Sequence, residues 1–236
     1  MTAAERLIAT AEGQLGYLGK KTNAQLDDFK ANPGGRFNRF ARDLDALGNF
    51  YNGRKNGYDW CDVFVDWCFV HTFGRALAQL LLCQPDRSLG AGTGYSLSYY
   101  KQKGRFFTTP QPGDQIFFGD SKSTWHTGIV VKVAGGFVHT VEGNAGNPSA
   151  VRACRYTIGG RNIKGYGRPE WSLVPDEKED DDMTYYKNIG DVPSYYRAAV
   201  DKAVKAGALS GTGDGVNVSE DLCRILTVLD RMGKLD

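Results

Sequence analysis

The feature that most constrains the fold is a nearly unbroken apolar run that follows a cysteine, in residues 58–70 (YDWCDVFVDWCFV). The run ends at His71 and Gly74, and such a run predicts a helix buried in the core. Asp59 is expected to cap the start of this helix. Cys61 then lies in the first turn, where unpaired N–H groups and the helix dipole favour the thiolate and are expected to lower the thiol pKa.

A lone buried cysteine is usually a packing residue, and we interpret Cys68, deeper in the same helix, in this way. Cys61 can serve as a nucleophile only if a base and a group that orients the base come from elsewhere in the chain. Residues 126–144 (HTGIVVKVAGGFVHTVEGN) supply both kinds of side chain.

Two apolar segments within residues 126–144 predict antiparallel strands joined by a short turn at residues 134–136. His126 stands at the start of the first strand, and Glu142 and Asn144 stand at the end of the second. These two ends are neighbours in an antiparallel hairpin, so the three side chains are expected to meet at one end of the sheet. A cysteine at a helix start that faces a histidine held by a carboxylate or an amide is the arrangement that a thiol nucleophile needs.

Four motifs that occur in this order, WCDVFVDW, PGDQIFF, HTGIVV and VEGN, resemble the cysteine, histidine-dependent amidohydrolase/peptidase (CHAP) domain. The resemblance extends from about residue 5 to about residue 174. It implies an α+β, papain-like fold in which N-terminal helices pack on an antiparallel sheet. It also implies cleavage of an amide bond in peptidoglycan, with Cys61 as nucleophile, His126 as general base, and Glu142 and Asn144 as orienting residues.

His139 is an alternative third member of the site, because a related papain-like class of wall peptidases uses a second histidine after the same hairpin. Strand alternation puts His139 and Glu142 on opposite faces, so both cannot serve unless the strand bulges. The VEGN motif favours Glu142 and Asn144, and His139 is then a solvent-facing strand residue.

Three aromatic residues near the motifs are candidates for binding substrate: Tyr58, Trp60 and Trp125. The Tyr58 hydroxyl could also join the Cys61 N–H as a donor to an oxyanion. Tyrosines 95, 99 and 100 either line a groove for sugar and peptide chains or pack the domain.

We expect no metal ion or other cofactor. Some CHAP domains bind calcium through an acidic cluster just before the cysteine, but residues 49–58 (NFYNGRKNGY) contain no carboxylate. The formal net charge of +2 is too small to indicate a nucleic-acid partner. No apolar run reaches membrane-spanning length, so insertion into a membrane is not expected.

The N-terminal residues lack the pattern of a signal peptide. We therefore expect the protein to be made in the cytoplasm and to act on the cell wall after release by another route.

The sequence predicts three regions: a CHAP catalytic domain over residues 1–174, an acidic linker over 175–183, and a small helical module over 184–236. Residues 175–182 (PDEKEDDD) are the source of the linker prediction. In the module, Pro193 and Gly207 are expected to bound one helix and Ser219 to cap a second. The predicted inner face of the second helix consists of Leu222, Ile225, Leu226 and Leu229.

The module is similar to S-layer-homology repeats and to C-terminal modules of endolysins from Gram-positive hosts, which implies wall binding. Self-association is the alternative, because two helices make a small core.

Taken together, the two resemblances imply an endolysin of a Gram-positive phage or prophage, acting as an N-acetylmuramoyl-L-alanine amidase or as a stem or cross-bridge endopeptidase. Two other functions are left open. One is a non-catalytic wall-binding or virion structural protein, and the other is a papain-like protease that acts on protein.

Overall fold

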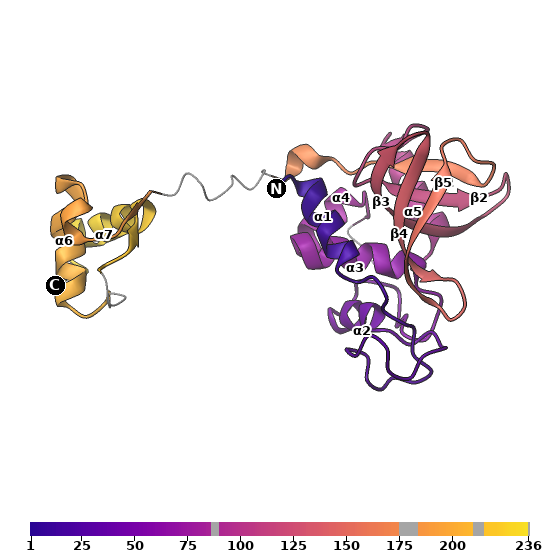
Figure 1. The fold of residues 1–236 in the computed structure, drawn as a ribbon, viewed down its shortest axis with the longest axis horizontal. Coiled ribbons are helices and arrows are strands. Elements are labelled where there is room, and N and C mark those ends of the chain that lie inside the picture. Colours follow the sequence, from indigo (N-terminus) through magenta and orange to yellow (C-terminus); the bar gives the residue numbers. More distant parts are fainter. Residues whose placement is uncertain (86–89, 175–183, 210–214, 236) are drawn as a thin grey trace. The chain divides into compact units, whose positions relative to one another are not determined.

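The computed structural model describes residues 1–85, 90–174, 184–209 and 215–235 (Figure 1). The chain divides into two compact units, Met1–Asp176 and Glu177–Asp236. The predicted acidic linker, residues 175–183, lies outside the described residues. Within the described part of the chain, no helix combines the length and the apolar character needed to cross a membrane.

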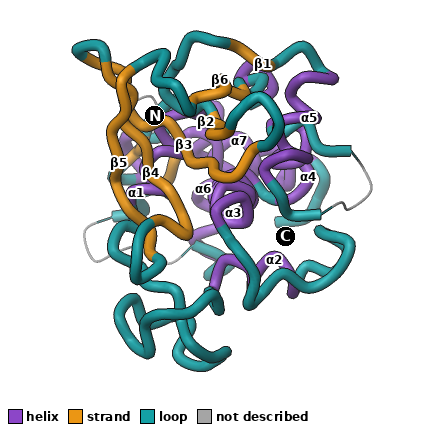
Figure 2. Tube along the Cα trace, turned by 90° about the vertical axis from the view of Figure 1, so that its right-hand side faces the viewer, coloured by secondary structure: helices purple, strands orange, loops and turns teal. Residues whose placement is uncertain are grey.

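In its described residues, the first unit combines five helices with one six-stranded antiparallel sheet (Figure 2). The strand order is β1-β6-β2-β3-β4-β5. The α+β class expected from the sequence is therefore confirmed. The helices are α1 (Ala3–Glu12), α2 (Arg39–Ala46), α3 (Cys61–Phe73), α4 (Arg75–Leu81) and α5 (Thr93–Gln102). The strands are β1 (Phe106–Phe107), β2 (Gln115–Gly119), β3 (Thr124–Ala134), β4 (Phe137–Ala145), β5 (Ala150–Thr157) and β6 (Ile163–Gly167), and a short 3₁₀ helix follows at Trp171–Leu173.

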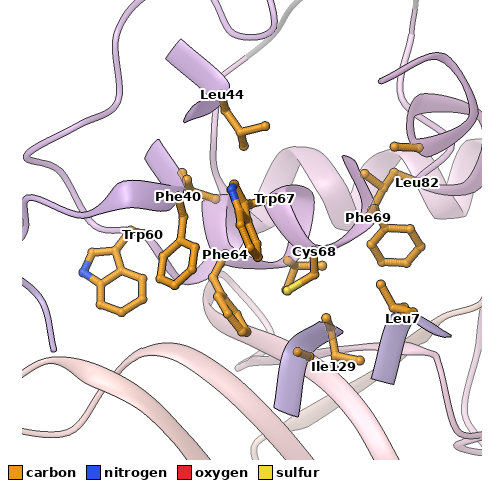
Figure 3. Close-up of a cluster of buried hydrophobic side chains, with 14 of the residues drawn as sticks. Leu7, Phe40, Leu44, Trp60, Phe64, Trp67, Cys68, Phe69, Leu82 and Ile129 are labelled. Carbon is orange, nitrogen blue, oxygen red and sulfur yellow. The ribbon is translucent and has the colours of Figure 1, made fainter. Parts of the chain in front are cut away.

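Helix α3 is the buried centre of this unit, as its nearly unbroken apolar sequence predicts. It packs against the helices α1, α2 and α4 and against the strands β3 and β4. Figure 3 shows Cys68 in the middle of the resulting cluster of apolar side chains, which confirms it as a packing residue. Because every face of α3 is covered, the position of Cys61 at its start is fixed by the whole core.

The expected cap at the start of α3 is wrong. The helix begins after Trp60, which provides no side-chain cap. Asp59 stands one residue too early, and its carboxylate instead contacts Arg36 at 3.2 Å and accepts a hydrogen bond from Asn144 at 3.1 Å. The N–H groups of the first turn of α3 are therefore not used by a capping carboxylate.

Strands β3 and β4 form the expected hairpin, with Gly135 and Gly136 at the turn. Both glycines have positive φ angles, 58° and 80°, which the tight turn requires. Ile129 pairs with Val141, and both side chains belong to the core around α3. Even-numbered residues at the end of β4 therefore face the opposite side of the sheet.

The second unit contains β7 (Tyr185–Tyr186), a 3₁₀ helix at Ile189–Asp191, α6 (Ser194–Lys205), β8 (Val218–Ser219) and α7 (Glu220–Arg231). As predicted, the Ser219 side chain caps α7 by accepting a hydrogen bond from the Leu222 N–H at 3.2 Å. The prediction for Ile225 is wrong, because its side chain is 55% exposed. Cys223 and Leu226 face the core. Ile225 directly precedes Leu226, so its side chain points about 100° around the helix axis from that of Leu226, away from the core.

Candidate active site

Cys61 is the first residue of α3 and lies where this helix meets the sheet. Its side chain is buried, and the backbone N–H groups of Asp62 and Thr127 lie close enough to the sulfur to favour the thiolate. Thr127 directly follows His126 on β3, so the contact brings the cysteine beside the histidine-bearing strand. Cys61 and His126 line the same pocket.

His126 and Glu142 form a direct pair across the β3–β4 hairpin. The imidazole Nε2 lies 2.8 Å from the Glu142 Oε2. Because Nε2 is engaged by the carboxylate, Nδ1 is the ring nitrogen left to accept a proton. This is the arrangement of a general base oriented by a carboxylate.

Two further hydroxyl groups hold the Glu142 carboxylate in place. The Thr140 hydroxyl donates to Oε1 at 2.6 Å, and the Tyr156 hydroxyl donates to Oε2 at 3.1 Å. Glu142 itself is almost fully buried. Its orientation toward His126 is therefore set by β4, where Thr140 lies, and by β5, where Tyr156 lies.

Glycines in the HTG and EGN motifs make room for this arrangement. A Cβ at Gly128 would lie only 2.5 Å from the Glu142 Cγ, so the glutamate side chain passes directly over this glycine. A Cβ at Gly143 would lie 2.4 Å from the Phe64 Cβ, so β4 packs against α3 at this point without a side chain between them. At both positions a larger residue would collide with a neighbouring side chain, so the close packing requires glycine.

Burial raises the pKa of the Cys61 thiol to about 12, and the nearby negative charges of Asp62 and Asp59 act in the same direction. The expected lowering of this pKa by the helix start is therefore wrong. The N–H groups of Asp62 and Thr127 favour the thiolate, but loss of hydration outweighs them. The thiol then keeps its proton at neutral pH, and the nucleophile forms only by proton transfer to a neighbouring base.

The structure separates the remaining candidates for the third member of the site. Asn144 lines the pocket, but its side chain donates to Asp59 and accepts from the Ser149 hydroxyl at 2.7 Å. His139 pairs in register with Lys132 on β3 and with Arg155 on β5. It lies outside the residues that line the pocket. Glu142 is the candidate whose carboxylate contacts His126.

The pocket has a volume of about 970 Å³ and an open mouth. Trp125, which is 50% exposed, lines it next to His126. Tyr58 is 65% exposed but lies outside the pocket lining. The residues that line the pocket are Asp59, Cys61, Phe118, Trp125, His126, Glu142, Asn144, Ala145, Gly146, Arg152, Cys154, Arg155, Tyr156, Thr157, Gly160, Arg161, Asn162 and Ile163.

The assignment of Trp60 to substrate binding is wrong, because its side chain is completely buried. Its ring stacks on Phe40 at a centroid distance of 5.6 Å and meets the edge of Tyr17 at 6.3 Å. Figure 3 shows Trp60 and Phe40 side by side in the apolar cluster. Trp60 therefore anchors the start of α3 and does not form a substrate wall.

The tyrosines of α5 divide between packing and exposure. Tyr99 and Tyr100 are buried, whereas Tyr95 is exposed and its ring lies against Gly90. None of the three lines the pocket.

A buried polar network supports the site from behind, and the sequence did not reveal it. The Gln115 amide donates to Asp62 and to the Thr127 hydroxyl, both at 3.1 Å. Ser96 on α5 also donates to Asp62, at 2.9 Å. The network ties the residue after Cys61 to the residue after His126.

No group of three or more histidine, cysteine, aspartate or glutamate side chains suited to a metal ion occurs among the described residues.

The comparison with family models agrees with the motif order. Residues 53–144 match the family model of the CHAP domain, and this range includes Cys61, His126, Glu142 and Asn144. A solved structure is also similar, the crystal structure of the NlpC/p60 domain of peptidoglycan hydrolase SagA. It has 15% sequence identity and a TM-score of 0.38, and the match covers 70% of this chain and 98% of that chain. No curated protein matched the sequence. The CHAP match supports a cysteine-dependent hydrolase.

Proposed function

We propose that this protein hydrolyses an amide bond of peptidoglycan with Cys61 as the nucleophile. The observation that carries the proposal is the His126–Glu142 contact of 2.8 Å in a pocket that Cys61 also lines. A buried carboxylate that orients a histidine beside a cysteine at a helix start serves nucleophilic catalysis. A protein that only binds the wall has no need of this arrangement.

The reaction begins with transfer of the thiol proton from Cys61 to His126. The sulfur attacks the carbonyl carbon of the substrate amide, and the carbonyl oxygen becomes an oxyanion. The tetrahedral intermediate collapses when the C–N bond breaks, and the leaving amine takes the proton from His126. Water then attacks the thioester, with His126 accepting a proton from it, and the carboxylic acid product and the free thiol are released.

Glu142 stabilises the imidazolium that forms in both steps. Its carboxylate lies in direct contact with Nε2 and is shielded from water. The raised pKa of Cys61 fits this role, because the charge pair forms when proton transfer is required and not in the resting thiol.

The backbone N–H of Cys61 is our candidate for the first oxyanion donor, because N–H groups in the first turn of a helix have no intrahelical acceptor. Tyr58, the second donor expected from the sequence, lies outside the pocket lining and is not part of this proposal. Trp125, at the mouth of the pocket, would contact the sugar or peptide chain of the substrate.

The proposed biological role is that of an endolysin from a phage or prophage of a Gram-positive host, made in the cytoplasm and acting on the wall after release. The bond is either the N-acetylmuramoyl-L-alanine amide or an amide of the stem or cross-bridge. The C-terminal unit would bind a wall polymer or mediate self-association.

The test is the loss of turbidity of purified Gram-positive walls with wild type, Cys61→Ala and Cys83→Ala. Cys83 is a matched control, because it is a free cysteine outside the pocket lining. We expect wild type and Cys83→Ala to clear the walls and Cys61→Ala to be inactive. Mass spectrometry of the products then identifies the bond: a stem with a free N-terminal L-alanine indicates an amidase, and a new amino terminus within the stem or bridge indicates an endopeptidase.

Equal clearing by Cys61→Ala and wild type would refute the mechanism and favour a role without this nucleophile. Turnover of protein substrates, with no action on walls of several chemistries, would instead establish a papain-like protease.

A further inference from the structure

One side of the active-site pocket carries an excess of positive charge. Arg152 and Arg155 on β5 and Arg161 in the loop before β6 all line the pocket, and all three residues are exposed. Arg155 is partly engaged, because its guanidinium lies over the Phe137 ring at 4.4 Å. The catalytic mechanism described above uses none of these arginines.

Arg152 is held in a fixed position beside the catalytic pair. It lies directly opposite Glu142 in the β4–β5 register, so both side chains leave the same face of the sheet. Its Nε donates to the Ala145 carbonyl and its Nη2 to the Pro148 carbonyl, both at 3.0 Å. The side chain also packs on Gly146, where a Cβ would lie 2.6 Å from Nε. These contacts fix the guanidinium before any substrate arrives.

These contacts leave the charge of Arg152 uncompensated, because both acceptors are neutral carbonyl groups. The two carboxylates that line the pocket have other partners, Glu142 with His126 and Asp59 with Arg36. Among the described residues, the ion pairs include neither Arg152 nor Arg161. The pocket thus presents a preorganised cation next to the reacting groups and a second one near its rim.

We propose that Arg152 and Arg161 bind a free carboxylate of the wall peptide near the scissile amide. This inference rests on the proposed function and adds a substrate class to it: peptides with a free carboxylate in preference to those in which it is amidated. A guanidinium matches a carboxylate geometrically and forms charge-assisted hydrogen bonds with it. A carboxamide has the same shape but no charge, and its NH₂ group would face the N–H donors of the guanidinium, with which it forms no hydrogen bond.

The experiment uses two synthetic muramoyl peptides that are identical except that the free carboxyl groups of one are carboxamides in the other. We expect wild type to cleave the acid peptide with a KM about tenfold lower and a similar kcat. Arg152→Lys keeps the charge but loses the planar fork, and it should remove most of this preference. Arg161→Gln, at an exposed position, should reduce the preference by about two- to threefold.

Arg54→Gln is the matched control, since Arg54 is exposed in the same unit and lies outside the pocket lining. It makes the same charge change as Arg161→Gln and should leave the preference intact. Equal KM values for the two peptides with wild type would overturn the arginine proposal while the hydrolase function stands. Equal loss of preference in Arg54→Gln and Arg161→Gln would also overturn it, because the effect would then be one of net charge.

Binding to the inactive Cys61→Ala protein separates this inference from the proposed function if wild type cleaves neither peptide. Calorimetric titration that shows tighter binding of the acid peptide, with the preference lost in Cys61→Ala/Arg152→Lys, would support the carboxylate site by itself. Equal binding of the two peptides, or no binding of either, would refute it.

Discussion

A single methyl group at Gly128 tests whether the His126–Glu142 contact carries the activity. Gly128→Ala would place a Cβ 2.5 Å from the Glu142 Cγ and 2.9 Å from the Val141 carbonyl oxygen. The Val141 carbonyl belongs to the β3–β4 ladder, so the glutamate side chain is the part that must move. Carbon atoms in ordinary contact are about 3.5–4.0 Å apart, so the required displacement is about 1 Å.

A displacement of that size breaks the catalytic contact. The Nε2–Oε2 distance would grow from 2.8 Å to beyond the range of a hydrogen bond. A misplacement of about 1 Å can cost about 10²-fold in rate, which corresponds to about 2.7 kcal/mol of transition-state stabilisation. We therefore expect kcat/KM for wall hydrolysis to fall by about two orders of magnitude. Crowding should also lower the free energy of unfolding by about 1–3 kcal/mol, so the assay is run well below the unfolding temperature.

A double-mutant cycle decides whether the loss acts through the glutamate. On a Glu142→Ala background the Cγ is absent, and adding Gly128→Ala should cost little further activity. Gly94→Ala is the control, because the position is helical and, among the described residues, no atom outside its own stretch of helix lies within 4 Å of the added Cβ. It should stabilise the protein by about 0.4–1 kcal/mol and leave activity unchanged. Wild-type activity in Gly128→Ala, or equal losses with and without Glu142, would refute the reasoning.

Three further predictions follow from burial, charge and composition. Trp60→Ala removes a buried side chain and should lower the free energy of unfolding by about 3–5 kcal/mol, whereas Trp125→Ala should leave Tm unchanged and raise KM. Thermal denaturation and steady-state kinetics measure the two effects, and an equal loss of Tm in both variants would contradict the prediction. The pKa of the buried Asp62 carboxyl is raised from 3.8 to about 6, mainly by desolvation. The folded state therefore keeps a proton that the unfolded chain releases, and the free energy of unfolding should fall as the pH rises from about 4 to 6. Asp62→Asn should remove this pH dependence, which amounts to a total of up to about 3 kcal/mol in the free energy of unfolding measured by urea titration. The same pH dependence in the two proteins would refute the assignment. Activity should survive treatment with a chelator; activity that is lost on chelation and restored by calcium would show that residues 49–58 or another segment bind the ion.

Local patterns were enough to predict the elements that carry the site. A nearly unbroken apolar run has no polar face to turn to solvent, which is why α3 could be predicted as a buried helix that begins near Cys61. The hairpin followed from its turn glycines and alternation, and alternation also places Thr140 on the same face as Glu142. These properties depend on residues close in sequence, and the structure agrees with them.

The features that could not be predicted depend on which distant segments meet. Trp60 and Trp125 are both adjacent to site residues, and Trp60 is buried because Phe40 and Tyr17, both distant in sequence, pack against its ring. Tyr156 reaches Glu142 through the β4–β5 register, which no local pattern in the sequence specifies. The direction of the Cys61 pKa shift likewise depends on how completely the fold removes water from the sulfur.

The protonated resting state of Cys61 has a consequence for its resistance to oxidation. Oxidants and alkylating agents react with thiolates and hardly at all with thiols. A nucleophile that stays protonated and buried is therefore spared the sulfenic acid and mixed disulfides that accumulate on exposed, acidic cysteines. The same desolvation that makes Cys61 depend on His126 for activation would preserve it in an oxidising medium.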